Sequence, residues 1–462
     1  MNQRISHIKK ETSIPPMVGV LIGISFYEIS DTVLYLVEPL FYPTLLRIVG
    51  MVLTIYYLSK ASYKRLDSGI TTVFNFMIFW SVIMLLRGSF MGNYIPGGPY
   101  GGVDLVRRAF MNSFGALTFF IPLMALMQMK WNSLYYIKRF AIVYCAISLI
   151  MTYMAKEQIA YGQISEGWTT IQDVNGEFIS VRTLIRSAFP GFGLTLFGLF
   201  CNNYIKGPIS LLFPIAIFFF FIAMAIGGGR GDTIFNLLYL IAYFYLLIRW
   251  YPINKGQNGR RSKGSRITRR VAAIVLSLGF GVLLLYLYKQ TDVFDYVLER
   301  AFGTKQLSTE IHSDSREILV RDFVQDFNAH PLDWIWGRGV NGSYVTHHLD
   351  INGRRAWMEW GYLYLVLKGG VVYLVLFVLC MLHAVYLGFR KSRNAFSKCL
   401  SVMCLMLLFD LSSTNAEPQF TTQFVLTWFC FGMLERKEVL MMSDDDICDY
   451  FDVKNHKRIE DK

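Results

Sequence analysis

Long apolar runs alternate with short polar connections along this chain, and one long polar segment, residues 291–357, interrupts the alternation. Most of the runs hold about 18 or more residues, the length that an α-helix needs to cross a hydrocarbon core of about 30 Å. The pattern therefore predicts an all-α polytopic integral membrane protein with about 12 transmembrane helices and one large loop. The predicted spans are residues 17–37, 40–58, 69–87, 109–129, 139–155, 187–205, 208–226, 232–250, 271–289, 360–389, 399–414 and 419–434.

The composition agrees with a membrane protein and favours no other class of protein. Of the 462 residues, 54% are hydrophobic and 17% are charged, whereas soluble domains carry about 25% charged residues. The net charge of +12 would suit a nucleic-acid-binding protein, but the basic residues lie in short loops between spans, where they orient the chain. We expect no nucleic-acid partner. The seven cysteines lie in predicted spans or near the C-terminus without metal-ligand spacing, so we expect neither a disulfide framework nor a metal site.

The basic residues predict the orientation of the spans. Four loops rich in lysine and arginine fall on the same side as the basic N-terminus when the spans alternate, so that side and both termini are expected to be cytoplasmic. The first span follows basic residues and precedes no cleavage site, as in a signal anchor. The chain then divides into four parts, which are nine spans with short loops (1–290), the large extracytoplasmic loop (291–357), three spans (358–434) and a cytoplasmic tail (435–462). We expect the tail to be solvated and partly disordered.

The predicted extracytoplasmic face carries twelve arginines and three lysines in its loops. The positive-inside rule should deplete both residue types there, so the excess of arginine needs another cause. One explanation is bidentate recognition of phosphate or carboxylate groups, and the other is snorkelling of the side chains toward lipid headgroups. Both stay open. The arginines are Arg87, Arg107, Arg108, Arg182, Arg186, Arg230, Arg300, Arg316, Arg321, Arg338, Arg354 and Arg355.

An amphipathic helix is predicted inside the large loop. Asp314 followed by Glu317 has the form of a capping box, and an apolar stripe of Val320, Phe323, Val324 and Phe327 follows before the sequence 330–331, His-Pro, ends the helix. Arg316 falls on the apolar stripe, where it lies in a frayed first turn or faces a site. Arg321 falls on the polar face, where solvation is expected.

A glycine-rich turn, residues 226–232, joins two predicted spans with almost no loop. The glycines let the backbone turn tightly, and the turn places Arg230 at the mouth of the bundle on the extracytoplasmic face. Arg230 either pairs with Asp232 as a structural ion pair or presents a guanidinium to an anionic group. A nucleotide-binding loop is not supported, because the lysine of a Walker motif is absent.

The end of the large loop holds candidates for a general base. Glu359 follows Arg355 by four residues, a spacing that suits a helical ion pair. It also suits a carboxylate base beside an arginine. His347 and His348 are alternative bases, although exposed loop histidines commonly have no catalytic role. The sequence leaves these interpretations open.

Five charged residues lie in or near predicted spans: Glu28, Asp31, Glu38, Arg47 and Asp410. Each charge in the middle of a membrane costs about 2.5–3.5 kcal/mol on insertion scales. We therefore expect these side chains to have partners inside the helix bundle or to lie nearer the membrane surface.

Three groups of residues resemble the O-antigen polymerase and ligase superfamily, whose polymerases are called Wzy. The sequence Gly-Arg-Gly at 229–231 resembles the family's short motif between adjacent spans. The stretch from Ser315-Arg316 to Gly-Arg-Gly at 337–339 resembles the start of the family's large external loop. The stretch 359–370, from Glu-Trp-Gly-Tyr-Leu to Lys-Gly-Gly, resembles the exit from that loop. The resemblance covers about 200–390 by motif and the first 200 residues only by hydropathy.

The resemblance implies a GT-C-like, metal-independent glycosyltransferase without a cofactor, in the bacterial inner membrane. Its substrates would be undecaprenyl-diphosphate-linked oligosaccharides, polymerised on the outer face into O-antigen of lipopolysaccharide, capsule or exopolysaccharide. Membrane lipid, a chain-length regulator and a flippase would be its partners. The residues expected to act as base are Glu359, His347 and His348. The residues expected to bind diphosphate are Arg230, Arg316, Arg321, Arg182, Arg186, Arg338 and Arg355.

Two other functions are considered beside the polymerase. A ligase would move finished polymer to another acceptor, but ligases of this family typically carry a histidine where this chain has Glu359. A flippase or permease for lipid-linked oligosaccharide would explain the charged residues in the first spans. It would not explain the large loop, and the sequence shows no internal repeat of the kind that transporters often have.

Overall fold

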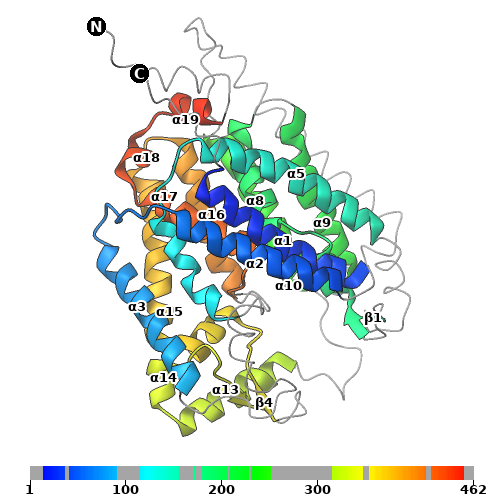
Figure 1. Cartoon of the computed structure of the whole chain (residues 1–462), viewed down its shortest axis with the longest axis vertical. Helices are drawn as coiled ribbons and strands as arrows, with labels where there is room; N and C mark the ends of the chain where they lie inside the picture. Colours follow the sequence, from blue (N-terminus) through cyan, green and yellow to red (C-terminus); the bar gives the residue numbers. More distant parts are fainter. Residues whose placement is uncertain are drawn as a thin grey trace, which may run out of the picture.

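A computed structural model describes residues 14–36, 41–90, 115–155, 170–172, 178–205, 208–227, 230–250, 315–346, 353–412 and 418–451. These residues form a mostly helical protein (Figure 1). The helices are α1 (Pro16–Leu36), α2 (Phe41–Lys60), α3 (Thr71–Phe90), η1 (Ala116–Leu126), α5 (Ser133–Met154), α7 (Val181–Ser187), α8 (Phe192–Phe200), η2 (Asn202–Tyr204), η3 (Pro208–Leu211), α9 (Leu212–Gly227), α10 (Arg230–Trp250), α13 (Ser315–Ala329), α14 (Leu332–Trp336), α15 (Gly361–Tyr386), η4 (Leu387–Lys391), α16 (Ala395–Ser412), α17 (Thr422–Leu434), α18 (Lys437–Met441) and α19 (Asp444–Tyr450). Two antiparallel strand pairs complete the fold, β1 (Thr170–Gln172) with β2 (Phe178–Ser180) and β3 (Tyr344–Val345) with β4 (Arg354–Arg355).

Five helices in the described part of the chain are long and apolar enough to cross a membrane. They lie in α1, α2, α5, α15 with η4, and α16, and five shorter apolar helices accompany them. The helix content and these apolar helices agree with the predicted all-α membrane protein. The count of about twelve spans stays a prediction, and the expected span 271–289 lies outside the described residues.

The expected span 187–205 is not one continuous helix. The chain forms α7, turns at Pro190 and Gly191, and continues as α8, which has only nine residues. Gly191 has φ +70°, a left-handed conformation that an L side chain rarely adopts. Hydropathy alone does not show such a break, because the residues on both sides of it are apolar.

Close packing of small residues joins α1 and α2. A Cβ atom on Gly23 would lie 2.6 Å from the carbonyl oxygen of Gly50, and one on Gly50 would lie 2.5 Å from the carbonyl oxygen of Gly23. Neither glycine could therefore carry a side chain unless the two helices moved apart. This kind of contact is typical of helices that pack within membranes, where small residues permit dispersion contacts between backbones.

Four of the charged residues in predicted spans, Glu28, Asp31, Arg47 and Asp410, have partners inside the bundle, which is one of the two outcomes expected for them. Glu28 of α1 accepts hydrogen bonds from the backbone N–H of Gly191 (2.7 Å) and of Thr422 (2.8 Å). These N–H groups stand at the beginnings of α8 and α17, so one carboxylate caps two short helices inside the bundle. Arg47 of α2 forms an ion pair with Asp31 of α1.

Asp410 of α16 also has partners inside the bundle. Its carboxylate accepts hydrogen bonds from the Tyr239 hydroxyl and from Nε2 of Gln423, the latter at 2.5 Å. These contacts link α16 to α10 and α17. Glu38, the remaining charge of the predicted set, lies outside the described residues.

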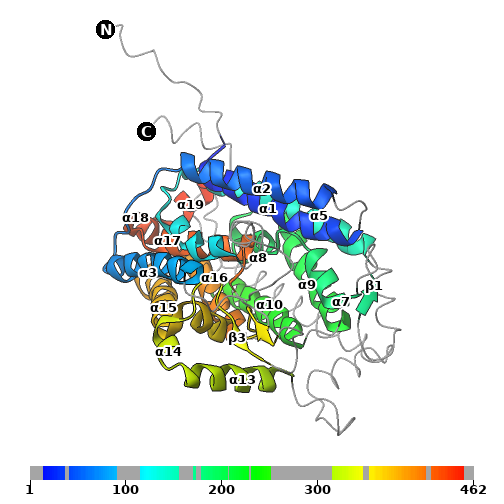
Figure 2. The same cartoon turned by 60° about the horizontal axis from the view of Figure 1, so that its bottom comes forward.

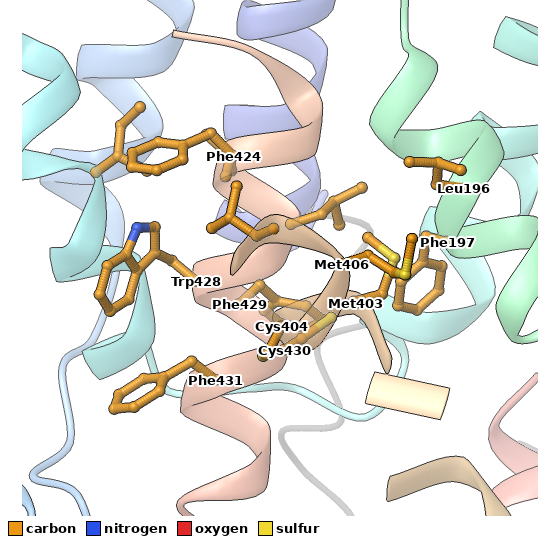
Figure 3. Close-up of a cluster of buried hydrophobic side chains, with 14 of the residues drawn as sticks. Leu196, Phe197, Met403, Cys404, Met406, Phe424, Trp428, Phe429, Cys430 and Phe431 are labelled. Carbon is orange, nitrogen blue, oxygen red and sulfur yellow. The ribbon is translucent and has the colours of Figure 1, made fainter. Parts of the chain in front are cut away.

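The centre of the bundle is an apolar cluster between α8, α16 and α17 (Figure 3). Trp428 of α17 is completely buried and contacts the rings of Phe424 and Phe431 on its own helix. Leu196 of α8 and Met403 of α16 approach the same region (Figure 3). The short α8 and α17 are therefore stabilised mainly by packing, since helices of this length are marginal on their own.

The two ends of the bundle carry different structures. Helices α13 and α14 lie at one end, and α18 and α19 lie at the other (Figures 1 and 2). Within the tail, which was expected to be solvated and partly disordered, residues 437–441 and 444–450 form α18 and α19. Ser443 and Asp446 form a capping box at the start of α19, and Ile447 is buried against the bundle. Local apolar residues and the cap therefore fold this segment despite its charge.

Candidate functional site

The candidate site is built where the large loop docks on α15. The docked segment, called the loop module below, comprises residues 315–346 and 353–360, with α13, α14, β3 and β4. Within it, α13 confirms the predicted amphipathic helix, and Phe323 and Phe327 of its stripe are fully buried. Arg321 is exposed on the opposite side, also as predicted.

The helix α15 is interrupted at Gly370, which has φ +69° and ψ 179°. An interruption of this kind leaves carbonyl groups of the preceding turn without partners in the helix. The loop module supplies partners, because the N–H groups of Arg338 and Gly339 donate to the carbonyls of Leu367 (2.8 Å) and Lys368 (2.9 Å). Backbone hydrogen bonds thus join the loop to the helix.

Glycines make this approach possible. A Cβ atom on Gly370 would lie 1.9 Å from the carbonyl oxygen of Ile335, and one on Gly337 would lie 2.5 Å from the carbonyl of Lys368. Both glycines also have positive φ angles. The Gly-Arg-Gly of the loop and the Lys-Gly-Gly of α15 are therefore the two sides of one contact.

Arg338 lies at the centre of the loop module and is 2% exposed. Its Nε donates to Asp333 (2.7 Å), and its Nη1 donates to Asp326 (2.5 Å) and to the Ser343 carbonyl (2.8 Å). Burial alone would lower the pKa of Arg338, but the two carboxylates raise it. Burial likewise would raise the pKa of Asp326, but hydrogen bonds from Arg338 and the N–H of Val345 hold it below its usual value. The group therefore stays ionised and links α13, α14 and β3.

Arg87 joins this network to α3. Its Nη2 donates to Asp333 (2.7 Å) and its Nε donates to the Gly337 carbonyl (2.7 Å). Nearby, the N–H of Val340 donates to the carbonyl of Met84 in α3 (3.1 Å). The loop module is thus attached to two apolar helices, α3 and α15.

Lys368 supports the same contact from α15. Its buried Nζ donates to the carbonyls of Gly342 (2.8 Å) and Ala356 (2.7 Å). Gly342 lies just before β3, and Ala356 lies just after β4. A lone lysine within an apolar run was a signal of such a role, because a buried ammonium needs acceptors. The sequence could not show which carbonyls would provide them.

Arg355 and Glu359 are the polar pair next to this docking contact. Nη2 of Arg355 lies 3.1 Å from Oε1 of Glu359, so the predicted ion pair forms. It does not form in a helix, because Arg355 belongs to strand β4 and Glu359 follows in a bend before α15. The Arg355 guanidinium also stacks over the Trp357 ring, with Cζ 4.9 Å from the ring centre. Arg355 is buried, whereas Glu359 is partly exposed.

The first turn of α15, which follows the pair in the chain, contacts α16 near the end of that helix. The Tyr362 hydroxyl, three residues after Glu359, donates to the carbonyl of Leu408 (2.6 Å). Asp410 follows two residues later in α16. This contact joins the start of α15 to the part of α16 that holds Asp410.

Four of the predicted site residues with described side chains lie in the loop module: Arg321, which is exposed, Arg338, Arg355 and Glu359. The contacts of Arg338 are those of a scaffold residue, and nothing in them tests binding of a diphosphate. Arg186 is half-buried in α7. Arg230, Arg182 and Arg316 lie in the first turns of α10, α7 and α13, and their side chains are outside the described part, as are both His347 and His348.

Sequence reasoning missed Asp326 and Asp333, which hold Arg338. Their only signal was position, since both lie in the predicted helical part of the loop near an arginine. Among the described residues, no group of three or more His, Cys, Asp or Glu side chains is arranged to hold a metal ion. Comparisons with protein-family models, curated proteins and solved structures found no match to this chain.

Proposed function

We propose that this protein polymerises undecaprenyl-diphosphate-linked oligosaccharide repeat units into a surface polysaccharide, as a metal-independent glycosyltransferase. It acts at the outer face of the bacterial inner membrane, with about twelve spans, both termini in the cytoplasm and the loop module outside. The finer identity of the polymer, whether O-antigen, capsule or exopolysaccharide, is set by the repeat unit of the host.

One observation carries the proposal: the two glycine-containing motifs of the resemblance, 337–339 and 368–370, are in direct contact. A chance likeness would not require the two motifs to meet. Their contact places a folded loop at one end of the bundle and presents Arg355 and Glu359 beside it. A large loop held in place by hydrogen bonds suits an enzyme that positions two substrates better than it suits a transporter, whose loops are usually short.

The chemistry follows from the groups at that end. An acceptor hydroxyl attacks the anomeric carbon of the donor sugar, the new glycosidic C–O bond forms, and the C–O bond to the diphosphate breaks. The hydroxyl proton passes to a base, for which the partly exposed carboxylate of Glu359 is the first candidate and His347 or His348 the second. The diphosphate leaves with the bonding electrons, and guanidinium groups stabilise its charge. Arg355 holds the Glu359 carboxylate in place, and Arg230, Arg316, Arg182, Arg186 and Arg321 are the candidates for the diphosphate.

The test uses purified full-length protein in nanodiscs with a polyprenyl-diphosphate-linked repeat unit from its own host. A ladder of longer glycans on a gel, formed with EDTA present, is the expected result. Glu359→Gln should lower the rate by roughly 10²–10⁴-fold, the range for a general base. Glu438→Gln is the matched control, because Glu438 is exposed on α18 at the other end of the bundle.

Other outcomes would separate the alternatives. Transfer of a preformed polymer to a second acceptor, without a ladder, would indicate a ligase. Movement of the lipid-linked sugar across the bilayer without new glycosidic bonds would refute the enzyme and indicate a flippase. A ladder unaffected by Glu359→Gln would leave the polymerase intact and assign the base elsewhere, with His347→Asn and His348→Asn as the next variants.

A further inference from the structure

The short helix α14 turns an apolar face away from the protein. Leu332, Ile335 and Trp336 are spaced by three and four residues, so they share one side of the helix, and they are 68%, 47% and 40% exposed. Asp333, on another side, is buried in the ion-pair network. A loop helix that faces water has the reverse arrangement, with charged residues outside and apolar residues inside.

This apolar face continues onto α3. The rings of Trp336 and Trp80 stack in parallel, with centroids 5.0 Å apart and planes at 8°. Trp80 belongs to α3, and α14 lies at the end of that helix (Figure 1). Like α14, α3 exposes large apolar side chains along its length; they are Phe76, Phe79, Val82 and Leu86. Because α3 is one of the predicted spans, these exposed groups are expected to face lipid, and α14 extends the same surface.

The level of α14 relative to α3 is given by Arg87. This arginine lies in the last turn of α3 and donates to Asp333 and to the Gly337 carbonyl. Asp333 is the second residue of α14, and Gly337 directly follows its last residue. An arginine at the end of an apolar helix is typical of the membrane surface. Tryptophan, present here as Trp336, is also enriched at that level.

We propose that α14 is inserted into the bilayer surface on the side of the loop module, with Leu332, Ile335 and Trp336 in contact with lipid. The occupant of this face is the membrane in which α3 lies, because the two apolar surfaces are continuous. Interfacial helices bury their apolar faces by about 5–10 Å. The loop module is thereby held against the membrane as well as against α15. If the proposed function holds, this anchor keeps the site at the depth of a lipid-linked diphosphate, but the insertion does not rest on that function.

Nitroxide spin labels test the insertion in the full-length protein in lipid nanodiscs. A label at Ile335→Cys is compared with labels at Phe79→Cys, on the lipid-facing side of α3, and at Gln325→Cys, exposed on α13. Collision rates are measured with oxygen, which concentrates in lipid, and with a nickel chelate, which stays in water. The oxygen-to-nickel ratio at Ile335→Cys should approach that at Phe79→Cys and exceed that at Gln325→Cys, because an inserted face meets oxygen in lipid and not the chelate in water. Leu332→Cys gives a second position on the same face, and unsubstituted protein gives the background from native cysteines.

Two results would overturn the proposal. A ratio at both α14 positions equal to that at Gln325→Cys would show that the face lies in water. Labels shielded from both reagents, with dipolar broadening between copies, would show that a second copy of the chain covers it. The polymerase assay is a separate experiment, so a failure of the insertion leaves the proposed function standing, and the reverse also holds.

Discussion

Arg338→Met should loosen the loop module, because the arginine is the shared partner of two buried carboxylates. Methionine keeps an unbranched side chain but removes the donors to Asp326, Asp333 and the Ser343 carbonyl. Breaking a buried ion pair by removing one partner costs about 3–5 kcal/mol. Asp333 keeps its bond from Arg87, so we expect the lower end of this range, about 3 kcal/mol.

Hydrogen exchange of the amides at residues 323–345 measures this cost directly. A loss of about 3 kcal/mol raises the equilibrium constant for opening roughly 100-fold, since each 1.4 kcal/mol is a factor of ten. Arg321→Met is the matched control. It removes the same charge from the exposed side of α13, and surface changes of this kind stay within about 0.5 kcal/mol.

Two results would refute this reasoning. Wild-type exchange in Arg338→Met would show that the ion pairs do not hold the loop module. Unchanged exchange together with lost polymerase activity would show instead that Arg338 acts on the substrate, as the sequence had suggested for the diphosphate. Loss of both protection and activity is the outcome that the scaffold role predicts.

Two further predictions concern the docking contact and the other end of the bundle. Gly370→Ala should lower the thermal unfolding midpoint in detergent, because it adds a Cβ 1.9 Å from a carbonyl oxygen at a positive φ angle, a strain of at least about 1–3 kcal/mol. Gly69→Ala, whose Cβ would meet nothing within 4 Å, should leave it unchanged, and equal midpoints for the two variants would contradict the docking geometry. Burial raises the pKa of Glu435 from 4.5 to about 7, so ionising this carboxyl should cost stability as the pH rises through that interval. Glu435→Gln should therefore gain up to about 3 kcal/mol over the parent at pH 8, and lose this advantage below about pH 4, in unfolding curves across pH. Glu438→Gln, which keeps Glu435, should follow the pH profile of the parent, and a parallel pH profile for Glu435→Gln and the parent would show that Glu435 is not the group responsible.

The amphipathic helix of the loop could be predicted because its information is local. The capping-box pattern of Asp314 and Glu317 and the stripe of Phe323 and Phe327 lie within fifteen residues of sequence, and α13 begins and ends within a residue or two of the expected positions. Asp314 itself lies outside the described residues. The Arg355–Glu359 ion pair was one of two interpretations of the spacing, the other being a carboxylate base beside an arginine. The ion pair does form, but the backbone conformation differs from the expected helix. Arg355 lies in a strand and Glu359 in a bend.

The docking contact could not be predicted from its motifs. A glycine signals a positive φ angle or a close approach, but it does not say which backbone approaches. Gly337 and Gly370 are separated by a strand pair and the first turns of α15, and their contact depends on where Asp326 and Asp333 place Arg338. Only the folded loop shows this.

The sequence by itself determined the apolar helices, five of which in the described part are long enough to cross a membrane, because the hydrophobic effect acts on every apolar run whatever its neighbours. It also determined the helix in the loop, through contacts between residues three and four apart. Only the tertiary structure decided where helices break and which charges meet. Glu28 caps helices whose first N–H groups lie 163 and 394 residues away. No local pattern encodes such partners, because a buried carboxylate requires donors but does not specify which part of the chain supplies them.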